Sequence, residues 1–157
     1  MSTPASPPTP RTLTELSMPP ELKELIRTAP MRTKPMSIAY VDEQGAPSLS
    51  FRASIQPFGD SQLALWVRDP NGGLVRAIGS NPQVALLYGD MNSPSAVVSM
   101  RGRARVDASE AVRSAVYGSA PELERKADPD KRGVAVVVDL DGVHGRMPGY
   151  RFEMRRA

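Results

Sequence analysis

The segment from Ser48 to Pro82 holds the residues whose types and spacing best suit chemistry. Its first part alternates polar with apolar residues, and in an extended strand the polar ones share one face: Ser50, Arg52, Ser54 and Gln56. A guanidinium offers a planar fork of donors and hydroxyls add neutral donors, so this face suits a phosphate group. The alternative is that the polar face simply meets water.

A second feature lies in the turn before the next helix. Gly72 and Gly73 stand where a helix begins, and the first backbone N–H groups of a helix are unpaired and attract anions. Arg68 precedes this turn and Arg76 lies one turn into the helix. A capped surface helix with ordinary arginines is the alternative. Next to the polar strand face, the pattern favours a site for a small phosphorylated ligand.

These two features belong to a chain that is punctuated like a β protein. Turn residues separate short apolar runs, and we expect strands over residues 37–41, 48–56, 62–67, 83–88, 96–106, 133–140 and 150–155. Short helices are expected over residues 20–27, 72–80, 109–117 and 121–126, the second capped by Asp69 or Asn71. Because strand and helix do not alternate regularly, the pattern predicts a mainly β fold, an antiparallel barrel with short peripheral helices.

The length of 157 residues fits one domain. Residues 1–15 are rich in proline, serine and threonine and predict a disordered tail, which leaves residues 16–157 as a single domain. No apolar stretch approaches the length of a membrane span, and the first residues lack the apolar core of a signal peptide. We therefore expect a soluble, cytoplasmic protein with no membrane partner.

Composition narrows the classes of function. Cysteine is absent and His144 is the single histidine, which excludes disulfides and argues against a zinc site. The formal net charge is +3, with acidic residues interleaved among the basic ones. That balance argues against a dedicated nucleic-acid binder. We expect the alternating Arg101, Arg103 and Arg105 to form the solvent-facing side of a strand.

Four segments carry a resemblance to a known family: "GAPSLSFRASIQ", "QLALWVRDPNGGLVRAIGSNPQVALLYGD", "MRGRARV" and "GVAVVVDLDGVHG". In this order they resemble the FMN-binding split barrels of the pyridoxamine 5'-phosphate oxidase family, from Leu22 to Glu153. The resemblance implies a six- to seven-stranded antiparallel split barrel that works as a homodimer and binds FMN at the dimer interface. Residues 16–157 would be that domain.

The resemblance also implies a set of site residues. In the family, an arginine on the second strand and the residues opening the helix hold the FMN phosphate. Arg52 occupies the place of that arginine, and residues 66–68 flank the flavin ring. Together with the polar strand face and the arginines around the helix turn, this gives as cofactor-binding residues Ser50, Arg52, Ser54, Trp66, Val67, Arg68, Gly72, Gly73, Leu74 and Arg76. For Trp66, ordinary packing is the competing interpretation.

The chain departs from the family at three places. Pro57 stands where the oxidases have a lysine, and Gly73 and Leu74 stand where they have an Arg-Lys pair. The C-terminal arginine–histidine pattern that binds pyridoxal phosphate is not recognisable. These departures argue against oxidation of vitamin B6.

His144 is the candidate catalytic residue. It lies between Gly142 and Gly145, in an expected loop after the long strand 133–140. A histidine between glycines is usually a surface residue, but in the family the corresponding loop reaches the cofactor pocket of the partner subunit. His144 would then donate a proton or orient a substrate.

The function these features favour is an FMN-dependent oxidoreductase that acts on an unidentified small molecule. One alternative on the same fold is a deazaflavin-dependent reductase. Another is a non-catalytic flavin- or haem-binding protein, in which His144 is the one available histidine ligand. A barrel that has lost its cofactor and serves as a structural dimer is the last.

Overall fold

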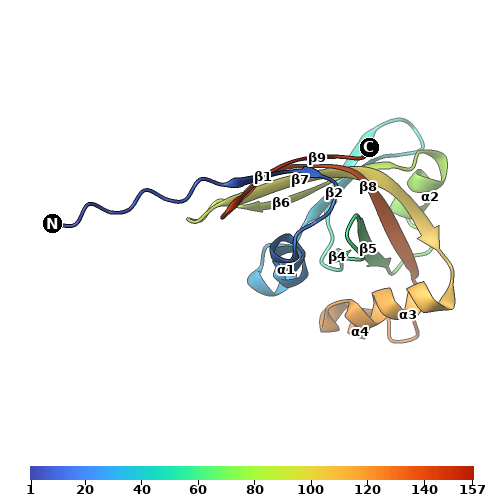
Figure 1. The fold of residues 1–157 in the computed structure, drawn as a ribbon. Coiled ribbons are helices and arrows are strands. Elements are labelled where there is room, and N and C mark those ends of the chain that lie inside the picture. Colours follow the sequence, from blue (N-terminus) through green and yellow to red (C-terminus); the bar gives the residue numbers. More distant parts are fainter.

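A computed structural model describes residues 1–157 and joins nine strands into one sheet (Figure 1). The strands are β1 (Arg11–Glu15), β2 (Ser37–Val41), β3 (Pro47–Phe51), β4 (Gln56–Pro57), β5 (Gln62–Val67), β6 (Gln83–Asp90), β7 (Ala96–Asp107), β8 (Val134–Met147) and β9 (Tyr150–Arg155). The helices are α1 (Pro20–Thr28), α2 (Gly73–Ser80), α3 (Glu110–Ser119) and α4 (Glu122–Ala127), with a 3-10 turn, η1 (Pro30–Arg32). None of the helices is long and apolar enough to cross a bilayer.

Six strand positions form a ring. Antiparallel pairings run from β3 through β2, β6, β7, β8 and β5 to β4. Because β4 follows β3 directly in the chain, this connection closes the ring. The second half of β8 leaves the ring and pairs with β9. The expected antiparallel split barrel with short peripheral helices is confirmed.

The N-terminal segment is a correction to the expected tail. Residues 11–15 form β1, which pairs in parallel with β9. Residues 1–10, which precede β1, lie outside helices and strands and project away from the domain (Figure 1). The period-two signal of β1 is weak because Leu13 is its one apolar residue, half-buried between exposed neighbours.

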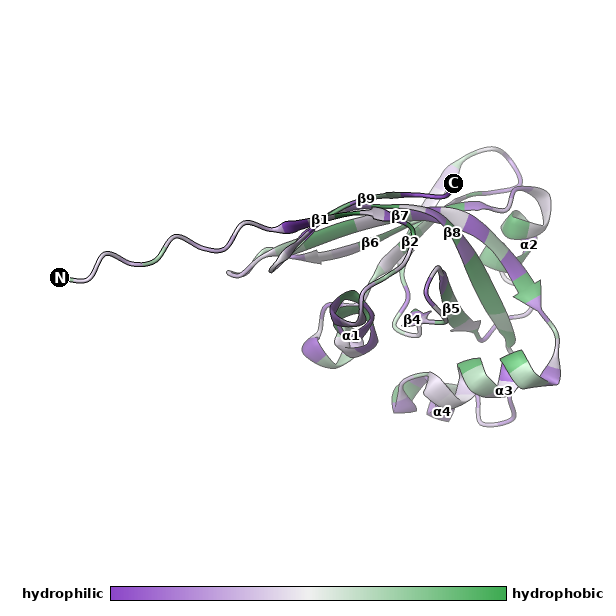
Figure 2. Ribbon diagram, viewed as in Figure 1, coloured by the Kyte–Doolittle hydropathy of each residue, from purple (hydrophilic) through white to green (hydrophobic).

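The core follows the alternation of side chains along the strands. In β5, Leu63, Leu65 and Val67 point into the barrel, while Ala64 and Trp66 point outward under α3. The first half of β8 is buried on both faces, and its valine run is hydrophobic along its whole length (Figure 2). Such a strand reads as a continuous apolar run rather than an alternating one.

Two helices close the barrel with amphipathic faces. Pro20 begins α1, and Leu22 and Ile26, one turn apart, are fully buried against the core. In α2, Leu74 and Ile78 have the same spacing and the same role. α2 packs against β2 and β7, and this packing fixes the position of its N-terminus.

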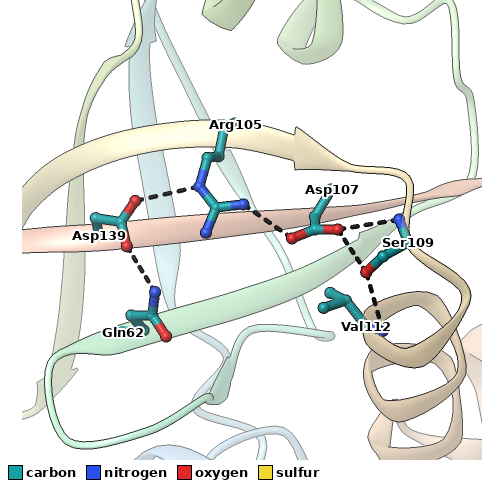
Figure 3. Close-up of polar contacts among 6 residues, drawn as sticks. All are labelled: Gln62, Arg105, Asp107, Ser109, Val112 and Asp139. Atoms are coloured by element: carbon teal, nitrogen blue, oxygen red, sulfur yellow. Dashed lines mark hydrogen bonds and ion pairs between the residues drawn. The ribbon is translucent and has the colours of Figure 1, made fainter.

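A chain of polar contacts ties the barrel wall to α3 (Figure 3). Asp139 on β8 accepts hydrogen bonds from Gln62 at 2.6 Å and from Arg105 at 3.3 Å. Arg105 also donates to Asp107 at 2.9 Å, and Asp107 accepts from the hydroxyl and the N–H of Ser109, the N-cap of α3. These bonds, led by that of the Ser109 hydroxyl, lower the pKa of Asp107.

The expected strand over residues 48–56 is wrong in its second half. β3 ends at Phe51, and the chain turns through residues 52–55 before β4. The alternative interpretation, in which the polar side chains of this strand face water, is also wrong. Leu49 and Phe51 are 71% and 75% exposed, whereas Ser50 is half-buried. The polar face of β3 therefore does not face water.

The expected loop around His144 is also wrong. β8 continues through Gly142 and Gly145 to Met147, paired with β7 on one side and β9 on the other. Gly145 permits this because its φ of +131° favours glycine and a Cβ there would lie 2.1 Å from the Val97 carbonyl oxygen. The glycines thus mark a tightly packed strand, not a turn.

Candidate functional site

One cavity of about 540 Å³ gathers eight of the ten residues expected to bind a cofactor. It lies between the turn after β3, the end of β5 and the start of α2. Its lining is Phe51, Arg52, Ala53, Ser54, Trp66, Val67, Arg68, Asp69, Gly72, Gly73, Leu74 and Glu124. The volume falls in the range of small-molecule sites, about 300–1,000 Å³.

Arg52 is the cation of this cavity that has no acidic partner. Its Nε donates to the Ser50 hydroxyl at 3.3 Å, and its guanidinium forms no ion pair with any carboxylate of the chain. Its backbone N–H is held by the Met36 carbonyl at 2.9 Å. A fixed arginine without a carboxylate partner is available to an anionic ligand.

The start of α2 adds backbone donors to the same cavity. Gly72 is the N-cap, and no side chain caps the helix. The expected cap by Asp69 or Asn71 is wrong, since Asp69 Oδ1 accepts instead from the Asn71 N–H at 2.9 Å. The N–H groups of Gly73 and Leu74 have no acceptor within the chain. Unpaired N–H groups at a helix start bind anions.

Two acidic side chains also line the cavity, and neither was among the expected site residues. Glu124 on α4 forms an ion pair with Arg68, with 3.3 Å between Oε2 and Nε. Asp69 lies at the mouth of α2, in the DPNGG turn. The lining therefore has two arginines and two carboxylates, and Arg52 carries the charge that no partner neutralises. The turn could have signalled Asp69, but nothing local signals Glu124, which lies in a solvated helix far along the chain.

Some residues of the set line the cavity but serve packing. The Trp66 indole is 2% exposed, meets Tyr117 edge-on at 5.1 Å between ring centroids, and donates to Asp128 Oδ2 at 2.9 Å. It has no open face for a flavin, so packing is its role. Leu74 and Val67 belong to the hydrophobic core. They shape the cavity from beneath.

Two other residues of the set lie outside this cavity. Ser50 shares its cross-strand position with buried Ile38 and meets the site only through Arg52. Arg76 turns away, bonding Glu43 with 2.8 Å between Nε and Oε1 and donating to the Asn71 carbonyl. Arg76 lies three residues after Gly73, and the direction of its side chain depends on how α2 is rotated about its axis. The spacing from the turn does not define that rotation.

His144 lies on the outer face of the sheet, not in the cavity of its own chain. It pairs with Ser99 of β7 and Glu153 of β9. The same cross-strand row continues through Leu87 and Ser37 to Phe51. His144 is half-buried there, and its imidazole forms no hydrogen bond within the chain.

Phe51 connects the cavity to an exposed apolar patch. The apolar patch consists of Leu49 and Phe51 on β3 and Leu87 on β6, which are 71%, 75% and 45% exposed. Ser37 of β2 pairs with both Phe51 and Leu87, so the three side chains lie on one face of the sheet. Contiguous apolar patches on a protein surface are where association is looked for first.

Comparison with known proteins bears on the fold. No protein-family model and no curated protein matches the chain. Among solved structures, HupZ of Group A Streptococcus is similar at a TM-score of 0.66 and 15% identity, covering 85% of this chain and 98% of that one. A pyridoxamine 5'-phosphate oxidase-like protein of Lactobacillus delbrueckii gives 0.60 and 17%, covering 83% and 96%. An FMN-binding protein of Syntrophomonas wolfei gives 0.61 and 10%, covering 80% and 86%.

The chain has the pyridoxamine 5'-phosphate oxidase-like fold. This confirms the resemblance read from the four sequence segments at the level of the fold. Solved structures of this fold include FMN-binding proteins, and in this chain the arrangement brings Arg52 and the start of α2 to one cavity.

Proposed function

We propose that the chain binds FMN, with the phosphate held by Arg52 and the start of α2, and acts as a flavin-dependent oxidoreductase on a small molecule. The observation that carries the proposal is the meeting, in one cavity, of a guanidinium without a carboxylate partner and two N–H groups without acceptors. Together they offer an anion both charge-assisted and backbone hydrogen bonds.

In this proposal each residue of the cavity has a physical task. Arg52 binds the phosphate, and the N–H groups of Gly73 and Leu74 donate to it. Glycine at position 73 lets the ligand approach the backbone closely, since no side chain intervenes. The Arg68–Glu124 pair holds α4 beside the cavity and helps to exclude water. Bound FMN would supply hydride or electron transfer, which the protein positions.

The proposal includes a homodimer. Its support is that Phe51 belongs both to the cavity wall and to the apolar patch. A second copy seated on the apolar patch would bury Leu49 and Phe51 and close the cavity on that side. A two-fold, self-complementary contact is the commonest way to do this. His144 lies on the same outer face, so this dimer is the arrangement in which it would act on the cofactor of the other copy.

The deciding experiment is titration of the purified protein with FMN, followed by absorbance and flavin fluorescence. We expect Arg52→Ala to weaken FMN binding by roughly 1.5–3 kcal/mol, the scale of a hydrogen bond to a charged group. Arg76→Ala is the matched control, because Arg76 is engaged by Glu43 outside the cavity, and it should bind FMN as the wild type does.

The outcomes separate the alternatives. Unchanged FMN affinity in Arg52→Ala would remove Arg52 from the site. Binding of deazaflavin in place of FMN would favour the reductase alternative on this fold. A Soret band on addition of haem that disappears in His144→Ala would favour the haem-binding alternative.

A further inference from the structure

A second cavity lies directly beside the candidate FMN cavity. Its volume is about 590 Å³, within the range of small-molecule sites of about 300–1,000 Å³. It is bounded by α1, η1, the turn between β3 and β4, and the loop between α3 and α4. Both cavities are lined by Ala53 and Ser54, so this pair of residues separates them.

The charged groups at the second cavity are already neutralised. Lys23 forms an ion pair with Asp60. Arg27 donates to both carboxylate oxygens of Glu24, at 2.9 Å and 2.6 Å. The rest of the lining is largely apolar, with Met31 69% exposed at its edge and Ile55 buried at its base. A charged ligand would give up its hydration without finding an unpaired charge here. A neutral apolar ligand has little hydration to give up.

One buried polar group breaks the apolar lining. Gln56 is only 7% exposed, and its amide nitrogen donates to the carbonyls of Val116 at 3.1 Å and Ser54 at 3.3 Å. These two bonds fix the orientation of the amide. Its Oε1 accepts no hydrogen bond within the chain. Every fully buried side-chain nitrogen or oxygen of the protein has a hydrogen-bond partner, so Oε1 is not fully buried and reaches open space. Gln56 lines the second cavity, and we infer that Oε1 opens into it.

We propose that the second cavity binds a neutral, largely apolar small molecule that donates one N–H or O–H hydrogen bond to Gln56 Oε1. An acceptor fixed in an apolar wall selects such a ligand, because a buried acceptor without a donor costs free energy. Its role as the substrate pocket beside the flavin rests on the proposed FMN site. The binding site itself stands on its own lining.

Three naphthalene probes test the site in the full chain. The probe 2-naphthol is apolar with one O–H donor, naphthalene lacks the donor, and 2-naphthoate adds a negative charge. We expect 2-naphthol to bind with a change in its fluorescence, naphthalene to bind about 2- to 10-fold more weakly, the scale of one neutral hydrogen bond, and 2-naphthoate to bind most weakly. Equal affinity for all three, or preference for 2-naphthoate, would overturn the proposal.

Two methionine variants locate the probe. Met31→Asp places a charge at the edge of the cavity and should abolish 2-naphthol binding. Met91→Asp is the matched control, since Met91 is 76% exposed but lies in the β6–β7 hairpin, outside the lining. It should leave probe binding unchanged. Binding that survives Met31→Asp, or that both variants weaken alike, would overturn the assignment.

Two further measurements complete the test. Gln56→Met removes the acceptor, so it should bring the affinity for 2-naphthol down to that for naphthalene; a retained difference would show that Gln56 is not the acceptor.

FMN is titrated in parallel on the same samples. If FMN binds and 2-naphthol does not, this inference fails and the proposed function stands. If 2-naphthol binds and FMN does not, the binding site stands and its role as a substrate pocket fails. Displacement of 2-naphthol by FMN would overturn the separation of the two cavities.

Discussion

The Ser54 hydroxyl joins the turn after β3 to the backbone of Trp66 on β5, accepting from the Trp66 N–H at 3.0 Å and donating to its carbonyl at 2.9 Å. Both groups are buried. A hydroxyl has one hydrogen to donate, and here Trp66 receives it. Ser54 was expected to help bind phosphate, but its place is structural. Its two bonds hold the chain where it turns away from the direction of β3, and Ser54 lies in the wall between the two cavities.

The first prediction tests that role. Ser54→Ala should lower the free energy of unfolding by about 1–3 kcal/mol, because two buried backbone groups of Trp66 lose this partner. Urea denaturation measures the change. Ser50→Ala is the control, since Ser50 only accepts a 3.3 Å bond from Arg52, and it should change stability little. A Ser54→Ala protein of normal stability but poor FMN affinity would make the hydroxyl a phosphate ligand after all.

The second prediction concerns Asp128, which is 7% exposed. Burial by itself would raise its pKa, but hydrogen bonds from the N–H groups of Arg132 and Gly133 and from the Trp66 indole outweigh burial and lower it. A carboxyl whose pKa is lower in the folded state stabilises the fold above its unfolded pKa. That stability is lost as the pH falls through the folded pKa.

Asp128→Asn should therefore cost about 2 kcal/mol of unfolding free energy at pH 7, the scale of a hydrogen bond to a charged group. The difference from the wild type should shrink as the pH falls below the ordinary value of an aspartate. Urea midpoints across the acid range give the measurement. Asp130→Asn, at an exposed carboxyl of the same loop, should show neither effect. A difference that grows toward acid pH would contradict the assigned shift.

The third prediction tests packing around the Trp66 indole. A Cβ at Gly133 would lie 2.4 Å from the Val67 carbonyl oxygen and 2.8 Å from Trp66 Nε1. Gly133→Ala should destabilise the protein by about 1–3 kcal/mol or more, since backbone has to move. Gly118→Ala, in α3 with no atom within 4 Å of its Cβ, should stabilise it by about 0.4–1 kcal/mol. Thermal unfolding of the two variants should move in opposite directions, and a shift of the same sign would refute the prediction.

The fourth prediction addresses the proposed homodimer. Leu49→Glu places a charge in the apolar patch and should shift a dimer to monomers in light scattering. FMN affinity should fall with it, since the cavity would lose its cover. Leu123→Glu is the control, because Leu123 is 81% exposed on α4, away from the apolar patch, and it should stay dimeric. A wild type that is monomeric at high concentration would end this part of the proposal.

Much of the barrel could be predicted because its turns are local. The strands β2, β5 and β9 occur where the sequence predicted them, bounded by turn residues and prolines. The break after Phe51 could not, since the apolar–polar alternation runs on without interruption through Gln56. The bend there is imposed by Trp66, twelve residues away, through the Ser54 hydroxyl. Such a contact leaves no mark in the period of the strand.

The candidate site was predictable to the same extent. Arg52 and Gly73 line the same cavity because the end of β3 and the start of α2 both lie beside the end of β5. These elements follow one another closely in the sequence, so a local sequence motif was enough to predict their meeting. Arg76 was misplaced because its partner, Glu43, lies in a different turn. Glu124 was missed because α4 approaches Arg68 only in the folded chain.

The long strand β8 is held on both edges over most of its length, by β7 on one side and by β5 and then β9 on the other. Its amide hydrogens should therefore exchange with solvent more slowly than those of any other segment. Local opening of either half has to separate two ladders at once, so we expect β8 to open less readily than the helices. The wall that carries β5, and with it Trp66 and Arg68, is anchored to the most persistent part of the molecule.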